Sequence, residues 1–315
     1  MPRTLLRELS GDERASYFSG MVSLWGGGLP EDKFVAWQRR LADSSESAGR
    51  YRLLGLFDQD AGELLSALKA YTFEGSVEGE PVRVLGIGAV FTPERLRKRG
   101  FASRLLHLAM EDARLRGHDC ALLFSDIGTR YYEELGFFAL ESNECQLDPQ
   151  SLPKSHGFRA AAPGDELTVS RIFAACRTPQ PRFSLARDGW SVRFQLRRLR
   201  ELARVRDVGE PEWGLIVEGS LGDAAAMIRH TKEALDVLDC AWTTNQARDR
   251  LLGGLRECAL RSNRARIRVW PAHQTRPLWP FSPRSSAIAM IAPIKATVRL
   301  PPAGTRAELA LLDHI

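Results

Sequence analysis

This chain of 315 residues contains one short segment whose residue types and spacing are suited to binding a ligand. It lies between positions 90 and 102, where the sequence reads VFTPERLRKRGFA. A strand that runs into a basic, glycine-containing turn and then starts a helix presents free backbone N–H groups and the positive end of the helix dipole. Gly100 lets the backbone approach a ligand closely, and Ala102 keeps the first helical turn clear. Three basic side chains can neutralise phosphate charge: Arg97, Lys98 and Arg99. The segment therefore predicts an anion cradle that suits a pyrophosphate better than a long duplex.

A second group of polar residues follows the predicted helix. The next strand leads into Ser125-Asp126-Ile127-Gly128, and Tyr132-Glu133-Glu134-Leu135-Gly136-Phe137 comes after it. The segment 97–102 matches the R-x-x-G-x-A form of the acetyl-CoA signature of the GNAT superfamily of N-acetyltransferases. The order of strand, helix, strand and Y-E-x-x-G-F ending also resembles that family, so the resemblance implies an acetyltransferase that uses acetyl-CoA as acyl donor.

The resemblance assigns roles residue by residue. It implies that the backbone of Ala89, Val90 and Phe91 binds the pantetheine arm and donates an N–H to the thioester oxygen. It implies that Tyr132 protonates the departing sulfur, with a purely packing tyrosine as the alternative, whereas Tyr131 points elsewhere on the helix. The remaining implied cofactor-binding positions are Arg97, Lys98, Arg99, Gly100, Phe101, Ala102, Ser125 and Gly128.

Acetyl transfer to an amine also needs a group that removes a proton from the amine. Two carboxylates are candidates: Glu74, at the end of a predicted strand, and Asp126, at the mouth of another. Glu74 could equally be a solvated turn residue, and Asp126 could cap a helix. In some tandem relatives the C-terminal carboxylate enters the site, and the apolar ending ELALLDHI would allow that here.

A narrower resemblance covers about residues 85 to 138. The extra residue between Pro93 and Arg97 and the SDIG-x-x-Y-Y run look like the fungal lysine N-acetyltransferases of lysine catabolism. Phe137 stands where those proteins are expected to have Trp. This resemblance implies a small primary amine as acceptor, with lysine or a related amino acid as the leading example.

Hydrophobic periodicity predicts the elements that must position these groups. Apolar residues at helical spacing predict helices over 13–25 and 31–44, separated by the GGGLP break, and over 102–116, where Gly117 is expected as the cap. Strands are predicted over 51–58, 63–75, 80–91 and 120–126, with a short helix at 129–135. The predicted fold is α/β (α+β), with a mixed twisted sheet flanked by helices.

The second half repeats the rhythm of strands and helices. A boundary near 150 predicts a catalytic acetyl-CoA-binding domain over 1–150 and a degenerate GNAT-like domain over 151–315. No R-x-x-G-x-G/A turn follows a strand in the second half, so we expect it to contribute to the acceptor site and not to bind phosphate. Domain interfaces are favoured positions for such pockets.

Composition excludes several classes of protein. There is no apolar run of about 20 residues and no secretory signal, so we expect no membrane partner and a cytoplasmic location. The five cysteines have no CxxC or histidine partner at metal-ligand spacing, which predicts reduced thiols and no metal. His107 and His118 are expected at the surface. The sequence does not indicate the oligomeric state.

The sequence is compatible with four hypotheses about function. The favoured hypothesis is acetylation of a small-molecule amine, and the alternatives are a protein or peptide N-acetyltransferase, a non-enzymatic CoA-binding sensor and a nucleic-acid binder. The last would use the arginine-rich segment 193–207, but no aromatic stacking platform is interleaved with the arginines. A solvated basic helix is the preferred interpretation of that segment, and no nucleic-acid partner is expected.

Overall fold

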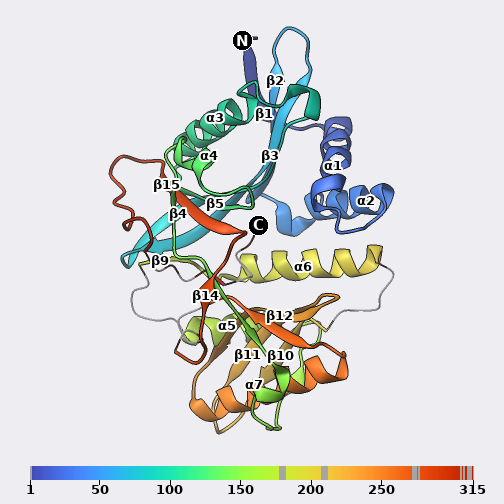
Figure 1. The fold of residues 1–315 in the computed structure, drawn as a ribbon, viewed down its shortest axis with the longest axis vertical. Helices are drawn as coiled ribbons and strands as arrows, with labels where there is room; N and C mark the ends of the chain where they lie inside the picture. The colour runs from blue at the N-terminus through green and yellow to red at the C-terminus, as the bar shows by residue number, and fades with distance from the viewer. Residues whose placement is uncertain are drawn as a thin grey trace.

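Two mixed β-sheets with helices packed on their faces make up the molecule (Figure 1). This computed structural model describes residues 2–176, 182–206, 212–271, 275, 277–305, 307, 309–310 and 314. The predicted α/β class is confirmed. No helix within the described ranges is both long and apolar enough to cross a membrane.

The first sheet carries the strands that the sequence predicts in the first half. Its central strands are long and almost continuously buried, as expected for a sheet covered on both faces. β1 was not predicted; it is a strand of five residues at the sheet edge, and none of them is fully buried. In spatial order the sheet contains β1 (Thr4–Glu8), β2 (Tyr51–Asp58), β3 (Leu64–Val77), β4 (Glu80–Phe91), β5 (Cys120–Ser125), β15 (Ile288–Pro293) and β6 (Phe138–Ala139), while β9 (Phe183–Leu185) pairs with β3.

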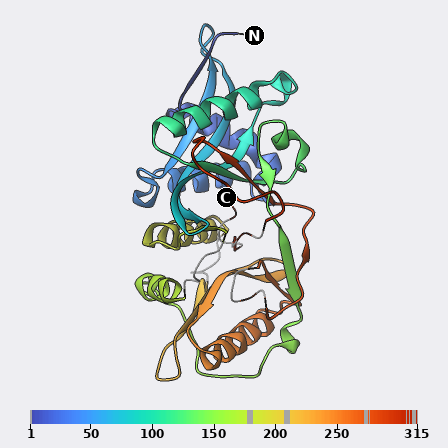
Figure 2. The same ribbon diagram turned by 90° about the vertical axis from the view of Figure 1, so that its left-hand side faces the viewer.

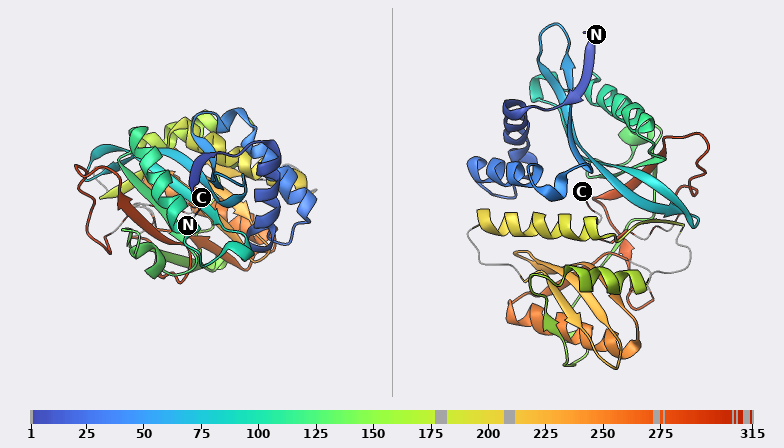
Figure 3. Two further views of the ribbon diagram at one scale, coloured as in Figure 1. Left: turned by 90° about the horizontal axis from the view of Figure 1, so that it is seen from above. Right: turned by 180° about the vertical axis from the view of Figure 1, so that it is seen from behind.

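Helices cover both faces of this sheet, as the right-hand view of Figure 3 shows. α1 (Gly11–Trp25) and α2 (Glu31–Ala42) lie on one face, and α3 (Phe101–Leu115) lies on the other. α3 buries Leu105, Ala109 and Ala113, which recur every fourth residue and form one face of the helix. It ends before Gly117, whose φ of +86° is the left-handed conformation predicted for the cap. The short helices of this half are η1 (Ser45–Ser47), η2 (Glu94–Leu96), α4 (Arg130–Glu133) and η3 (Pro149–Ser151).

The second sheet repeats the chain path of the first. β10, β11 and β12 form an antiparallel meander, α7 crosses over, and β13 returns parallel to β12, as β2, β3, β4, α3 and β5 do in the first sheet. α5 (Glu166–Ala175) and α6 (Gly189–Val205) precede this meander. The remaining elements are β7 (Asn143–Leu147), β8 (Arg159–Ala160), β10 (Gly214–Val217), β11 (Ala224–His230), β12 (Ala234–Trp242), α7 (Asn245–Arg261), β13 (Arg266–Val269) and β14 (Ser282–Pro283).

Strands cross between the two halves of the chain. β9 and β15, from the second half of the sequence, pair within the first sheet, whereas β7, from the first half, pairs with β13 and β14 in the second. In Figure 2 the green strand β7 runs from the upper part of the molecule into the lower part. The functional division near residue 150 stays a prediction, and a cut there would remove β15 from between β5 and β6.

The arginine-rich segment forms α6, which lies between the two sheets (Figure 1). Glu201 of this helix is fully buried and pairs with Arg40 of α2 and with Arg197 and Arg204 of α6 itself. The expectation of a simple solvated basic face is therefore wrong for α6, because Arg197 and Arg204 neutralise the buried Glu201, which also pairs with Arg40 in the first half of the chain.

His118 also departs from its expected position at the surface. Its side chain is 3% exposed, its Nε2 lies 3.1 Å from Thr72 Oγ1, and its Nδ1 lies 3.0 Å from the carbonyl oxygen of Ala113. Burial lowers the pKa of His118, so the neutral ring serves as a packed hydrogen-bonding group after α3. His107 is exposed on α3, as expected.

The crossing of β15 into the first sheet can be tested by one core substitution. Ile291 is 0% exposed and pairs with Leu122 on β5 and Phe138 on β6. Ile291→Ala should lower the free energy of unfolding by about 2–5 kcal/mol, the usual cost of such a cavity. Chemical denaturation measures this change, with Leu167→Ala, at a side chain 75% exposed on α5, as the matched control. Equal effects of the two substitutions would contradict the placement of β15 in this core.

Candidate active site

The site begins where β4 and β5 stop pairing with each other. The two parallel strands are in register from Val84 opposite Cys120 to Ile87 opposite Leu123. Beyond this point β4 continues to Phe91, while Phe124 and Ser125 of β5 pair only with β15 on their other side. The central sheet therefore opens between the carboxyl ends of two neighbouring strands.

A β-bulge in β4 accompanies this opening. On β3, Ala67 pairs with Phe91 and Lys69 pairs with Gly88, so that two residues of β4, Ala89 and Val90, oppose a single residue of β3. Ala89 has a φ of +47°, and its carbonyl oxygen accepts a 2.6 Å hydrogen bond from the Tyr17 hydroxyl of α1. Since a bulge leaves its extra residue out of the ladder, backbone groups of this segment are available to a ligand in the opening.

The basic turn lies next to the bulge and leads into α3. Gly100 is the residue before the helix and has a φ of +81°, a left-handed conformation that glycine adopts without strain. No side chain caps the start of α3. The first N–H groups of the helix therefore point out of its open end, where the helix dipole favours an anion.

A cavity of about 400 Å³ joins the bulge, the turn and α4. The predicted site residues in its lining are Val90, Phe91, Arg97, Lys98, Gly100, Phe101, Ala102 and Tyr132. The lining residues that the sequence did not indicate are Leu24, Thr92, Leu96, Ser103, Ile127 and Tyr131. The structure thus brings most of the predicted cofactor-binding residues together around one space.

The other predicted cofactor residues lie beside this lining. Ala89 forms the bulge, and the Arg99 guanidinium lies 5.1 Å from the ring centre of Phe101. Ser125 and Gly128 form the turn after β5, where the Ser125 hydroxyl donates a 2.5 Å hydrogen bond to the Gly128 carbonyl. These four residues are not among those that line the cavity.

Two adjacent tyrosines of α4 line the cavity. Burial, followed by the nearby Tyr131 and Asp126, raises the pKa of Tyr132 to about 12, so its hydroxyl stays protonated at neutral pH. Tyr131 was expected to point elsewhere, but its hydroxyl also reaches this region and lies 3.1 Å from Ser103 Oγ. Tyr132 therefore contributes a protonated hydroxyl to the lining of the cavity.

The two predicted carboxylates occupy different ends of the sheet. Asp126 follows β5 beside the opening, and its Oδ1 accepts a 2.9 Å hydrogen bond from the backbone N–H of Ala287. Glu74 is exposed and pairs with Arg83, at the opposite end of β4 from the bulge, about 17 Å away at the usual strand rise. The structure brings Asp126 near Tyr132 but does not bring Glu74 near either of them.

Sequence reasoning missed a set of basic groups on the sheet face that α6 covers. Lys69 lies on β3 opposite Gly88, and its Nζ donates a 2.8 Å hydrogen bond to Gln38 Oε1. Burial, and then the charge of Arg198, lower the pKa of Lys69 to about 7. Nothing in the sequence distinguishes this lysine from a surface lysine on a strand edge, because α6, which encloses it, lies more than a hundred residues further along the chain.

The last described residue also reaches this interior. Arg198 Nη1 donates a 3.2 Å hydrogen bond to the carbonyl oxygen of His314, whose ring packs against Phe124 of β5 and against Trp270. Burial lowers the pKa of His314 to about 3 and keeps the ring neutral. The C-terminal carboxylate belongs to residue 315, which lies outside the described residues.

Comparison with known proteins defines the class of this site. Residues 14–139 match the family model of the acetyltransferase (GNAT) domain, a range that contains the strand opening, the basic turn and Tyr132. This part of the chain is therefore similar to an acetyltransferase domain of the GNAT type. The search of curated proteins gave no match.

Solved structures extend the likeness to both halves. A probable N-acyltransferase from Enterococcus faecalis V583 is 14% identical, with 93% of this chain and 73% of that one covered at a TM-score of 0.68. A GCN5-related N-acetyltransferase from Kribbella flavida is 16% identical, with 92% and 70% covered at 0.66. Eis1 from Mycobacterium abscessus is 20% identical, with 93% and 74% covered at 0.57. At these identities the likeness shows a shared fold across nearly the whole chain.

The helix start at Gly100 yields a prediction about CoA. Gly100→Glu should weaken CoA binding by about 100-fold or more, because a carboxylate at the open helix start would repel the phosphates. Calorimetric titration with CoA is the measurement. Gly100→Ala controls for backbone strain at positive φ, and His107→Glu adds the same charge further along α3. Unchanged affinity in Gly100→Glu would remove the phosphate assignment.

The depressed pKa of Lys69 yields a prediction about stability. The folded protein holds Lys69 neutral above pH 7, whereas the unfolded chain keeps it protonated up to its ordinary pKa of 10.5. The unfolded state therefore binds more protons in this window, and stability should rise with pH from about 7 to 10 by up to about 1.4 kcal/mol per unit. Lys69→Met should flatten this rise in denaturant titrations, while Lys33→Met, at an exposed lysine of α2, should leave it unchanged. A rise of the same slope in Lys69→Met would contradict the burial of a neutral amine.

Proposed function

We propose that this protein transfers an acetyl group from acetyl-CoA to the primary amine of a small molecule, with lysine or a related amino acid as the leading acceptor. The observation that carries the proposal is the cavity in which the strand opening, the uncapped start of α3 and Tyr132 meet. Acetyl-CoA, when bound, supplies the thioester that the amine attacks. The residues of the chain bind, orient and stabilise charge around it.

The first role is to hold the phosphates. Arg97 and Lys98 line the cavity beside Gly100, and the N–H groups of the first turn of α3 add fixed partial positive charge. The bulge at Ala89 and Val90 supplies backbone groups further into the opening, where an N–H can stabilise a developing oxyanion. Phosphate binding and oxyanion stabilisation both use backbone N–H groups, so the proposal rests on the geometry of the strand and the helix start more than on any single side chain.

The second role is to stabilise the leaving thiolate. Tyr132 lines the same cavity with a protonated hydroxyl, and a hydrogen bond from this group to the sulfur would become stronger as negative charge develops. For the proton of the amine, Asp126 stays a candidate beside the opening, and Lys69, with a pKa of about 7, can accept a proton at neutral pH. Glu74 stays a sequence-based candidate that lies far from the bulge.

The covered sheet face favours a small acceptor over a polypeptide. α6 packs over the face that carries Lys69 and Tyr71. Phe194 of α6 makes an edge-to-face contact with Tyr71, and Trp190 makes one with Phe73. Arg198 of the same helix reaches the end of the chain at His314. A sheet face that is covered by a helix in this way admits a small amine more readily than an extended peptide, because a peptide needs an open groove.

Protein or peptide acetylation is the alternative within the same chemistry. The experiment that separates the two offers acetyl-CoA together with a panel of free amino acids and polyamines or with lysine peptides, and follows the release of free thiol. We expect turnover on small amines, with lysine among the first to be tested because of the resemblance over residues 85–138. Activity on peptides alone would overturn the small-molecule proposal. The absence of thiol release with every amine and peptide tested would leave the protein as a CoA-binding module.

The two tyrosines of α4 give a matched pair of variants. Tyr132→Phe should keep CoA affinity and lower kcat by about 10²-fold, the usual scale for the loss of one positioned donor. Tyr131→Phe removes a hydroxyl from the same lining and should have a much smaller effect, because that hydroxyl bonds Ser103. Steady-state kinetics with the preferred amine and calorimetry with CoA measure both. Equal loss of turnover in the two variants, or none in Tyr132→Phe, would show that another group stabilises the thiolate.

A further inference from the structure

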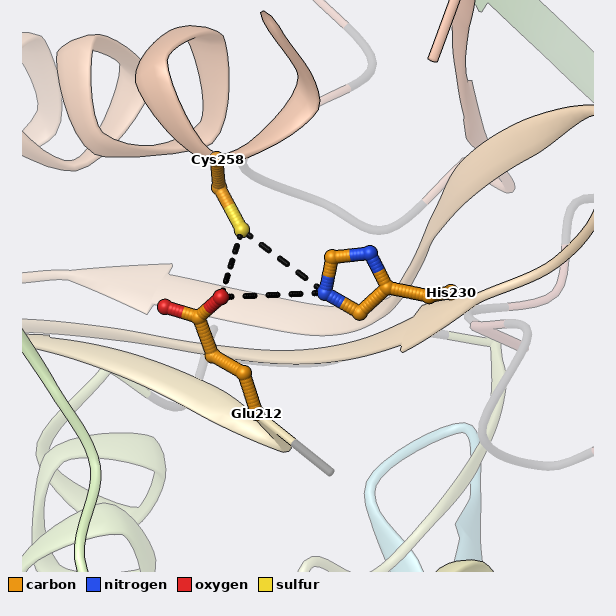
Figure 4. Close-up of side chains that lie close together, drawn as sticks. All are labelled: Glu212, His230 and Cys258. Atoms are coloured by element: carbon orange, nitrogen blue, oxygen red, sulfur yellow. Dashed lines mark hydrogen bonds and ion pairs between the residues drawn. The ribbon is translucent and has the colours of Figure 1, made fainter. Parts of the chain in front are cut away.

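Three residues with metal-ligating side chains meet in the second half of the chain, away from the acetyl-CoA cavity (Figure 4). Glu212 lies two residues before β10, His230 is the last residue of the neighbouring strand β11, and Cys258 lies on α7. Cys258 belongs to the buried face of α7, together with Leu251 and Leu255, so the packing of the helix on the sheet turns the thiol toward the strand ends. Local folding of three separate elements thus assembles the cluster.

The distances between the three ligand atoms match those around a bound metal ion. Glu212 Oε2 lies 3.1 Å from Cys258 Sγ and 3.7 Å from His230 Nε2, and Sγ and Nε2 are 3.8 Å apart. Ligand atoms of a tetrahedral zinc ion are about 3.3–3.6 Å apart, given its usual bond lengths. The nearest point equidistant from the three atoms lies about 2.1 Å from each. This distance equals the usual zinc–nitrogen and zinc–oxygen bond lengths and is about 0.2 Å shorter than the zinc–sulfur bond.

Charge and ligand type also fit a divalent ion. A thiolate and a carboxylate together neutralise two positive charges, and the neutral imidazole adds a ligand without charge. The mixture of sulfur, nitrogen and oxygen suits zinc and disfavours magnesium and calcium, which prefer oxygen alone. Arg261 Nη2 lies 3.0 Å from both oxygens of Glu212 and would orient this carboxylate as an outer partner.

We propose that Glu212, His230 and Cys258 form a zinc site that fastens α7 to the ends of β10 and β11, with water as the fourth ligand. Two of the ligands, Glu212 and His230, line a separate cavity of about 1100 Å³ that also touches the segment between α1 and α2 and one side of α6. This cavity gives the ion and its water a route from solvent.

A nucleophilic cysteine is a poorer interpretation of the same cluster. In such a site the histidine stands between the thiol and the carboxylate and takes the proton of the thiol. Here the thiol donates its hydrogen bond directly to Glu212, and Cys258 is only 1% exposed. A neighbouring carboxylate disfavours a free thiolate, whereas a metal ion would stabilise one.

The test uses the full chain without added histidines, stripped of metal with a chelator and dialysed against zinc. Elemental analysis should find one zinc ion per chain, and replacement by Co²⁺ should give the thiolate-to-cobalt charge-transfer absorption of a sulfur ligand. Cys258→Ser and His230→Asn should each lower zinc affinity by at least about tenfold, and Cys258→Ser should remove the charge-transfer band. Wild-type protein that retains no zinc would overturn the proposal outright.

Matched controls separate the site from general effects of substitution. Cys145→Ser removes another buried thiol of the same sheet, and His107→Asn removes an exposed histidine of α3, and both should retain zinc and the cobalt spectrum. Circular dichroism checks the fold of every variant. If Cys258→Ser does not fold, Glu212→Gln keeps the shape of the half-buried side chain and should still weaken zinc binding. Zinc retained at full stoichiometry in Glu212→Gln and His230→Asn, or lost in the controls, would contradict the assignment.

Discussion

The candidate site depends on the separation of two neighbouring parallel strands, β4 and β5, at the centre of the first sheet. β4 and β5 separate after Ile87 and Leu123, and an opened sheet would normally expose unpaired backbone groups. Two contacts make the opening stable: the Tyr17 hydroxyl holds the bulged carbonyl of Ala89, and β15 pairs with the far side of β5. The bulge, the basic turn and Tyr132 all take their positions from this separation.

The two halves share one chain path but differ at the start of the crossover helix. α3 begins after Gly100 with no side-chain cap, whereas α7 begins after Thr244, whose hydroxyl accepts a 3.1 Å hydrogen bond from the Ala247 N–H and donates a 2.5 Å bond to the Leu221 carbonyl. A helix start that is satisfied by its own side chain offers less to a phosphate. This difference supports the interpretation of the second half as a degenerate copy that covers the acceptor side and supplies strands to the first sheet.

Local patterns predicted most elements and much of the candidate site, because the turn from Arg97 to Ala102 and the segment around Tyr132 are short and continuous in sequence. The pattern failed where a partner comes from far along the chain. Burial, and then the charge of Arg198, lower the pKa of Lys69. His118 is buried against Thr72, and Cys258 meets Glu212 and His230 only after α7 packs on its sheet. The sequence spacing of the cysteines predicted no metal, since the cluster joins residues separated by 28 and 46 positions. Secondary structure is readable from neighbours in sequence, whereas burial and side-chain clusters depend on tertiary contacts.

The position of β15 has a consequence for the growing chain on the ribosome. Residues 288–293 form the strand that pairs with the side of β5 opposite β4, so the chain as far as residue 293 must leave the exit tunnel before that side is covered. Until then Leu122 and its neighbours present an apolar, hydrogen-bonding edge that can pair with other nascent chains. The first sheet therefore cannot complete its strand order before residues 288–293 are available, and the uncovered side of β5 is exposed to aggregation while the chain is being synthesised.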